Sequence, residues 1–336
     1  EIEVVCVNDG STDGSTEILR EAAAADSRVR SIEQENRGAG AAKNRALESA
    51  SGELLCVVDS DDLLLPEALA VLHEALDANV DIVHGSYAVT RPRSRRNRMR
   101  RSDLRTLTGP DCLAALISSE IRHDPWAKLF RRSLFADHQL QWPESLRCTT
   151  DLLIVYQAFH FARSVRTIPD PVYNYRKRPG SLQRGGAAAT FVSDRIAAFR
   201  SVMDFLRAQG VWETHADRLN LLGNRVFQGL VDHSIRTGAA PSSRRFADVL
   251  AAYNEGLPQF RLAPAAAADT FFSGLALRYA GVLSASTGDR TALATRLQEF
   301  LDSIDAGQLA AVPTAVVDEL RGHSPDDVNW YRIVRH

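Results

Sequence analysis

A run of apolar residues that ends on a cluster of carboxylates constrains this chain more than any other feature. Residues 54–58 read Leu-Leu-Cys-Val-Val, and Asp59, Asp61 and Asp62 follow at once. Such a run is typical of a buried parallel strand, and ligands of open α/β sheets bind at the carboxyl ends of the strands. Carboxylates this close repel one another unless a cation lies among them, so we expect a divalent metal here. The alternative is that Asp61 or Asp62 caps a helix opened by Pro66.

A second acidic strand end comes earlier in the chain. Residues 4–7 predict a strand, and the turn-forming residues 8–15 follow it, so Asp9 lies at a carboxyl strand end. Residues 35–40 then predict a glycine-rich turn before a helix, where Gly38 permits close backbone approach and Lys43 adds positive charge. This arrangement suits a diphosphate at a helix N-terminus, although it also serves as a plain connection.

Five short motifs occur in a characteristic order. They are Val-Asn-Asp-Gly-Ser-Thr-Asp at 7–13, Glu-Asn-Arg-Gly at 35–38, Ala-Lys-Asn at 42–44, Ser-Gly-Glu at 51–53 and Val-Asp-Ser-Asp-Asp at 58–62. Their order, spacing and loop chemistry resemble family 2 glycosyltransferases of the GT-A fold. The resemblance implies a Rossmann-like, mixed but mainly parallel sheet flanked by helices. It also implies transfer of a sugar from a nucleotide-diphosphate donor, with a UDP-sugar expected, to a hydroxyl of a cell-surface glycan or polymer.

The resemblance implies a role for each matching residue. The metal, Mn²⁺ or Mg²⁺, is expected at Asp61, with Asp62 as a weaker candidate. Lys43 stands where the family usually has arginine, which keeps the charge but loses the bidentate fork. The residues expected to bind the nucleotide are Asp9, Asn36, Gly38, Lys43 and Asp59.

Asp151 is the expected catalytic base. Residues 126–133 and 142–144 resemble the segment that precedes the family's catalytic acid, which usually follows a Glu; here the pair is Thr150-Asp151. Asp151 would take the acceptor proton in a metal-assisted single displacement with inversion. The alternative is that Asp151 only caps a helix starting at Leu152.

A strand and a Gly-Ser loop are expected at residues 168–181. In the family, such a segment follows the catalytic helix, so Arg176, Arg178 and Ser181 are expected to close over the diphosphate or to line the acceptor loop. A solvated edge strand is the alternative reading.

The family resemblance covers residues 1–185, and family members carry one further strand and helix before the Asp9 strand. We therefore expect this GT-A domain to be N-terminally truncated relative to the family. Restoring a unit of about thirty residues is expected to improve UDP binding.

Residues 186–336 are expected to form an α-helical region. Apolar residues recur at helical spacing over 191–209, 213–236, 244–256 and 269–284. These helices are candidates for oligomerisation or for contact with an acceptor, which would be a glycan, a polyol-phosphate polymer or a lipid-linked sugar.

Charge and hydropathy set limits on partners and location. The net charge of −2 over 336 residues gives no global attraction to nucleic acid, and no such partner is expected. No apolar stretch is long enough for a membrane span, so a cytoplasmic protein is expected, at most peripheral at the inner membrane face. The seven arginines within Arg91–Arg101 predict either a solvated loop or contact with an anionic membrane or polymer.

Two other classes of protein remain open. A sugar-1-phosphate nucleotidyltransferase would share the sheet and an acidic metal site. A catalytically impaired nucleotide-binding or polymer-binding protein is suggested by Thr150 and by the arginine run.

Overall fold

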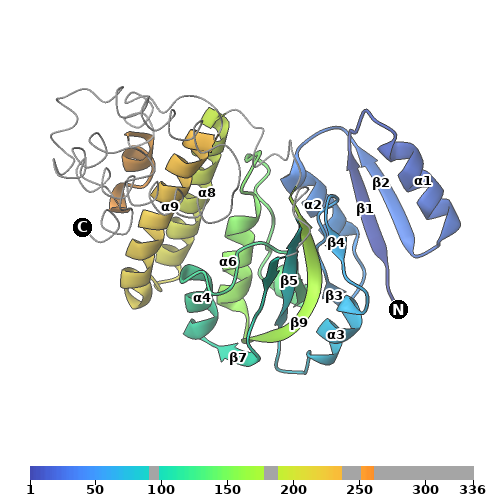
Figure 1. The fold of residues 1–336 in the computed structure, drawn as a ribbon, viewed down its shortest axis with the longest axis horizontal. Helices are drawn as coiled ribbons and strands as arrows, with labels where there is room; N and C mark the ends of the chain where they lie inside the picture. Colours follow the sequence, from blue (N-terminus) through green and yellow to red (C-terminus); the bar gives the residue numbers. More distant parts are fainter. Residues whose placement is uncertain (91–97, 178–187, 237–250, 261–336) are drawn as a thin grey trace, which may run out of the picture. The chain divides into compact units, whose positions relative to one another are not determined.

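The computed structural model describes residues 1–90, 98–177, 188–236 and 251–260 (Figure 1). The chain divides into two compact units, one of residues 1–182 with 201–215 and one of residues 183–200 with 216–336. The arginine run of residues 91–101 lies outside the described residues except for its last four.

The first unit begins with β1 (Val4–Asp9), α1 (Ser15–Ala25), β2 (Val29–Gln34), α2 (Ala39–Ser49), β3 (Leu54–Leu55), β4 (Leu63–Leu64) and α3 (Ala68–Glu74). It continues with β5 (Ile82–Thr90), β6 (Arg98–Arg100), β7 (Arg105–Thr108), α4 (Pro110–Ile117), β8 (Lys128–Arg131), α5 (Arg132–Asp137), α6 (Asp151–Phe161) and β9 (Ser164–Arg176). The later elements are α8 (Ala188–Ala208), the 3₁₀ turn η1 (Glu213–His215), α9 (Ala216–Arg236) and the 3₁₀ turn η2 (Pro258–Phe260).

Two sheets carry the first unit. β1 and β2 form a parallel pair, and the larger sheet has the strand order β3-β8-β5-β9-β4, with β6 beside β5 and β7 beside β9. β5 and β9 are parallel, whereas every other ladder of the larger sheet among the described residues is antiparallel. The mixed sheet flanked by helices is therefore confirmed, although parallel pairing is less dominant than expected.

β5 is the central strand because its residues are apolar or small and almost all of them are buried. A Cβ at Gly85 would lie 2.5 Å from Val172 Cγ2, so only glycine lets β9 pass this closely. The register between β5 and β9 shifts on either side of Ser86. α4 and α6 lie on one side of this sheet and α3 lies on the other (Figure 1).

β3 differs from the strand expected at residues 54–58. Only Leu54 and Leu55 pair, and they pair antiparallel with β8 at the edge of the sheet rather than with a parallel neighbour. In the described part of the chain, β3 has a neighbouring strand on one side only, which is β8. Val58, which follows β3, is 46% exposed. Residues 56–62 are therefore a loop that leaves the sheet edge and carries the carboxylates.

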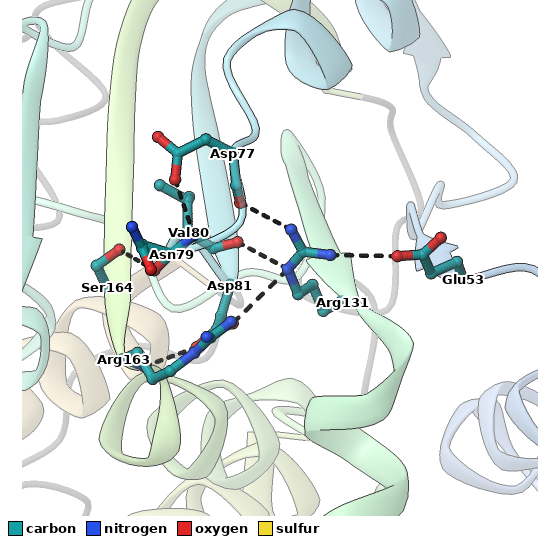
Figure 2. Close-up of polar contacts among 8 residues, drawn as sticks. All are labelled: Glu53, Asp77, Asn79, Val80, Asp81, Arg131, Arg163 and Ser164. Atoms are coloured by element: carbon teal, nitrogen blue, oxygen red, sulfur yellow. Dashed lines mark hydrogen bonds and ion pairs between the residues drawn. The ribbon is translucent and has the colours of Figure 1, made fainter.

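The buried carboxylate of Asp81 joins residues at the ends of β5, β8 and β9 (Figure 2). Asp81, just before β5, accepts hydrogen bonds from the backbone N–H of Arg163 at 2.7 Å and from its guanidinium at 2.5 Å. Arg131 of β8 lies 3.7 Å from the same carboxylate and donates to the carbonyl oxygen of Val80. Burial opposes ionisation of Asp81, but the bonds and charges of the two arginines outweigh it and lower the pKa of Asp81.

We expect Asp81→Asn to reduce the free energy of unfolding by about 2 kcal/mol at pH 7, less than for a wholly buried pair because Arg163 is 60% exposed. A lowered pKa in the folded state adds stability above the unfolded value of about 4, and that stability is lost as the pH falls below it. The difference between the variant and the parent in urea denaturation should therefore shrink below about pH 4. The exposed pair of Asp26 and Arg28 provides the control, since Asp26→Asn should change stability little. Equal effects of the two substitutions would contradict the proposed bracing role of Asp81.

The second region is helical where it is described. α8 and α9 match the helices expected over 191–209 and 213–236, and residues 251–256 are helical too. Residues 269–284 lie outside the described part. Among the described residues, no helix is long and apolar enough to cross a bilayer.

Candidate active site

Lys43 joins two carboxylates that are far apart in the sequence. Its Nζ atom lies 2.7 Å from Asp151 Oδ1 and 3.5 Å from Asp59 Oδ1. The side chain of Lys43 is 20% exposed, that of Asp151 is 23% exposed and that of Asp59 is 31% exposed. The cluster is therefore partly accessible to solvent. Burial disfavours the charge of Lys43, but the two carboxylates outweigh it and raise its pKa.

The surroundings of Asp59 disfavour its ionised form. Burial raises the pKa of Asp59, Lys43 opposes that effect, and the negative charges of Asp151 and Asp124 reinforce it. One ammonium group thus serves two carboxylates, and the cluster of Lys43, Asp59 and Asp151 carries a net charge of −1 when all three are ionised. A further positive charge would be stabilised here.

Asp151 is held by its site partners and does not cap its helix. α6 begins at Asp151 with Thr150 as the N-cap residue, and no side chain there bonds to the helix end. Asp151 Oδ1 instead accepts hydrogen bonds from Lys43 Nζ and from the indole Nε1–H of Trp142, each at 2.7 Å. No described residue bonds to Oδ2, which leaves that oxygen for a ligand.

The backbone of Trp142 is fixed by α2. The buried amide of Asn44 accepts a bond from the Trp142 backbone N–H at 2.7 Å and donates to the Trp142 carbonyl at 2.9 Å. A Cβ at Gly40 would lie 2.5 Å from the carbonyl oxygen of Pro143, so glycine is required for this approach of α2. Successive turns of α2 therefore present Gly40, Lys43 and Asn44 to the segment that supports Asp151.

Asp62 fastens the acidic loop to β9. Its Oδ2 accepts a bond from the Tyr173 hydroxyl at 3.0 Å and its Oδ1 accepts one from the backbone N–H of Arg176 at 2.8 Å. Burial raises the pKa of Asp62 to about 6. Because both oxygens bind β9, Asp62 is a support for the loop, and the expectation that it shares the metal is not supported.

The same contacts argue against a helix cap at Asp61 or Asp62. β4 lies between them and α3, whose N-cap residue is Glu67.

The Arg176 guanidinium donates to the carbonyl oxygen of Asp61 at 2.7 Å, which places this predicted loop residue beside the acidic loop. Arg178 and Ser181 lie outside the described residues.

Asp9 organises the glycine turn that was expected to bind a diphosphate. Its carboxylate accepts bonds from the backbone N–H groups of Arg37 at 2.9 Å and Gly38 at 2.8 Å, and from the side chain of Gln34 at 2.8 Å. Burial opposes ionisation, but these bonds outweigh it and lower the pKa of Asp9. The N–H of Gly38 is thus already engaged, while Asn36 is exposed at the same turn.

A buried lysine next to the site was missed from the sequence. Lys128 is wholly buried on β8, and its Nζ donates to the carbonyl oxygens of Arg122 at 3.0 Å and Asp124 at 2.6 Å. Burial lowers the pKa of Lys128 to about 7. These bonds hold the turn that places Asp124 near Asp59. A lysine within the apolar run 126–130 was the available signal.

A hollow in the first unit shares Asn44 with the surroundings of this cluster but does not include the cluster itself. It has a volume of about 400 Å³ and is lined by α2 and α5 together with residues 139–141. Asn44 lines it, but neither Asp59 nor Asp151 does. We place the site at the carboxylates because oppositely charged groups from three distant segments meet there.

The donor atoms present are compatible with a divalent metal completed by a ligand. No group of three His, Cys, Asp or Glu side chains within the described ranges is arranged to hold a metal ion. Mg²⁺ and similar hard cations commonly use one or two carboxylates together with substrate phosphates and water. Asp59 and Asp61, on one loop, offer such carboxylate oxygens.

Residues 1–138 match the family described as glycosyl transferase family 2. EpsH of Bacillus subtilis is 31% identical over 226 residues, which cover 65% of this chain and 64% of EpsH. The glycosyltransferase GlyG of Streptococcus pneumoniae is 29% identical over 218 residues, 59% of this chain and 68% of GlyG. The chain thus spans a little under two thirds of EpsH.

A polymer-modifying enzyme and its structure are similar as well. The poly(ribitol-phosphate) β-N-acetylglucosaminyltransferase TarS of Staphylococcus aureus is 29% identical over 223 residues, 65% of this chain and 37% of TarS. The structure of TarS 1–349 with UDP-GlcNAc is 19% identical, covers 81% of this chain and 82% of that chain, and gives a TM-score of 0.49. Residues 1–138 of this chain thus match glycosyltransferase family 2, and the chain is similar to proteins named glycosyltransferases.

Proposed function

We propose that this protein transfers a sugar from a nucleotide-diphosphate donor, with a UDP-sugar expected, to a hydroxyl of a polysaccharide or polyol-phosphate polymer. One observation carries the proposal: Lys43 and Asp59, within the family-matched residues 1–138, meet Asp151 at one site. The cluster combines a cation suited to phosphate with a carboxylate whose Oδ2 is bonded by none of the described residues.

Asp151 acts as the general base. Its Oδ1 is held by Lys43 and Trp142, so Oδ2 is oriented to accept the proton of the acceptor hydroxyl. The hydroxyl oxygen attacks the anomeric carbon as the bond to the nucleoside diphosphate breaks. Base and leaving group lie on opposite faces of the sugar, which makes the reaction a single displacement with inversion.

Asp59 and Lys43 bind the donor side. Asp59 faces the nucleotide, and Lys43 stabilises the negative diphosphate. A divalent cation at Asp61, with Asp59 beside it, would supply charge neutralisation for the departing diphosphate. Asp62 and Arg176 hold the loop that presents these carboxylates.

The acceptor class follows the relatives' names. TarS is named for transfer to poly(ribitol phosphate), and ExoO of Rhizobium meliloti, 31% identical over 194 residues, is named a succinoglycan biosynthesis protein. Both names refer to a glycan or a polymer. A polymer that offers free hydroxyl groups is therefore the acceptor to test first.

A donor screen with the full-length protein tests the proposal. Release of nucleoside diphosphate is measured against a panel of nucleotide sugars, with Mn²⁺ or Mg²⁺ and with polymer acceptors. We expect release of UDP from one UDP-sugar. Release of pyrophosphate from a sugar 1-phosphate and a nucleoside triphosphate would instead identify a nucleotidyltransferase. Binding of nucleotide sugars without any turnover would identify a non-catalytic binding protein.

A further inference from the structure

The ion pair of Lys43 and Asp151 links the donor side of the site to the base. Lys43 Nζ lies closer to Asp151 Oδ1, at 2.7 Å, than to Asp59 Oδ1, at 3.5 Å. A lysine ammonium has three N–H donors, and at least one of them is directed at the base. The residue expected to bind the diphosphate is therefore already engaged by the residue expected to take the proton.

A diphosphate beside Asp59 would compete for this ammonium. Phosphate oxygens are strong acceptors of charge-assisted hydrogen bonds, and Lys43 cannot give its full set of donors to Asp151 and to a diphosphate together. Asp151 would not lose its orientation when Lys43 turns away, because the indole of Trp142 still donates to the same oxygen at 2.7 Å. Asn44 in turn keeps Trp142 in place.

We propose that Lys43 is shared between Asp151 and the donor diphosphate, so that donor binding draws Lys43 away and releases Asp151 to act as base. This inference rests on the proposed function of the site. It assigns Lys43 a coupling role besides donor binding: Asp151 stays paired while the donor is absent and becomes available when the donor is bound. Trp142 is the positioning residue that keeps Asp151 oriented in both situations.

The inference predicts that removing the base strengthens nucleotide binding. In Asp151→Asn, Lys43 loses its competing anion, so we expect the full-length protein to bind UDP about tenfold more tightly in calorimetry at constant Mn²⁺. Loss of any nearby negative charge also favours an anion. The coupling must therefore be isolated by a double-mutant cycle with Lys43→Met. In the Lys43→Met background, Asp151→Asn should change the affinity for UDP by less than about twofold.

Two further variants make the cycle decisive. Lys43→Arg keeps the charge, and Asp151→Asn should again tighten UDP binding in that background. Glu48→Gln removes one negative charge on α2, but Glu48 is exposed and pairs with Arg45 rather than Lys43, so it should leave UDP affinity nearly unchanged. Thermal unfolding of each variant establishes that it is folded before its affinity is compared.

The outcomes separate this inference from the proposed function. Unchanged or weaker UDP binding in Asp151→Asn would overturn the sharing of Lys43. Equal tightening with and without Lys43 would also overturn it, because a general charge effect would then suffice. A parent protein that binds neither UDP nor any other nucleoside diphosphate would overturn the proposed function itself.

Discussion

Asp151→Asn is expected to lower the turnover number for sugar transfer by at least about 10³-fold, while the protein still binds UDP. The amide nearly preserves the shape of the side chain but cannot take the proton of an attacking hydroxyl. Turnover is measured as UDP release in the presence of acceptor, and binding is measured by calorimetry. The loss should lie in turnover, because Asp151 acts on the acceptor during the reaction.

Asp137→Asn is the matched control for this variant. Asp137 is an exposed carboxylate at the end of α5, and its substitution should leave transfer unchanged. An Asp151→Asn protein with the activity of its parent would refute the assignment of Asp151 as the base.

Asp61→Ala is expected to weaken metal-dependent donor binding by about 100-fold. The variant removes a carboxylate from the loop but keeps the backbone carbonyl to which Arg176 donates. UDP affinity is measured with Mn²⁺ and with a chelator, and the metal should strengthen binding in the parent but not in the variant. Ser60→Ala tests whether any change in the same exposed loop has this effect, and it should not. Equal enhancement by Mn²⁺ in the parent and in Asp61→Ala would contradict the metal assignment.

Much of the site was predictable because its chemistry is encoded at strand and helix ends. Asp59 lies on the loop after an apolar run, and the family resemblance indicates Asp151 at the start of an apolar helix. In the structure both carboxylates lie beside Lys43. Their individual catalytic roles remain predictions.

The rest depended on contacts between distant segments that leave no local pattern. Asp62 looks like a third metal carboxylate in sequence, but Tyr173 and Arg176, more than a hundred positions later, engage both of its oxygens. The bond from the Gly38 N–H to Asp9 also has no local signal in the sequence. The antiparallel pairing of β3 likewise depends on β8, because an apolar run records burial and not the direction of its neighbour.

The anomeric configuration of the transferred sugar tests the central claim most directly. Once the screen has identified a donor, the product of the full-length protein is examined by proton NMR, with the anomeric coupling of the donor as reference. A single displacement with Asp151 as base predicts inversion, so that an α-linked nucleotide sugar gives a β-linked product. A product that retains the α configuration would contradict it.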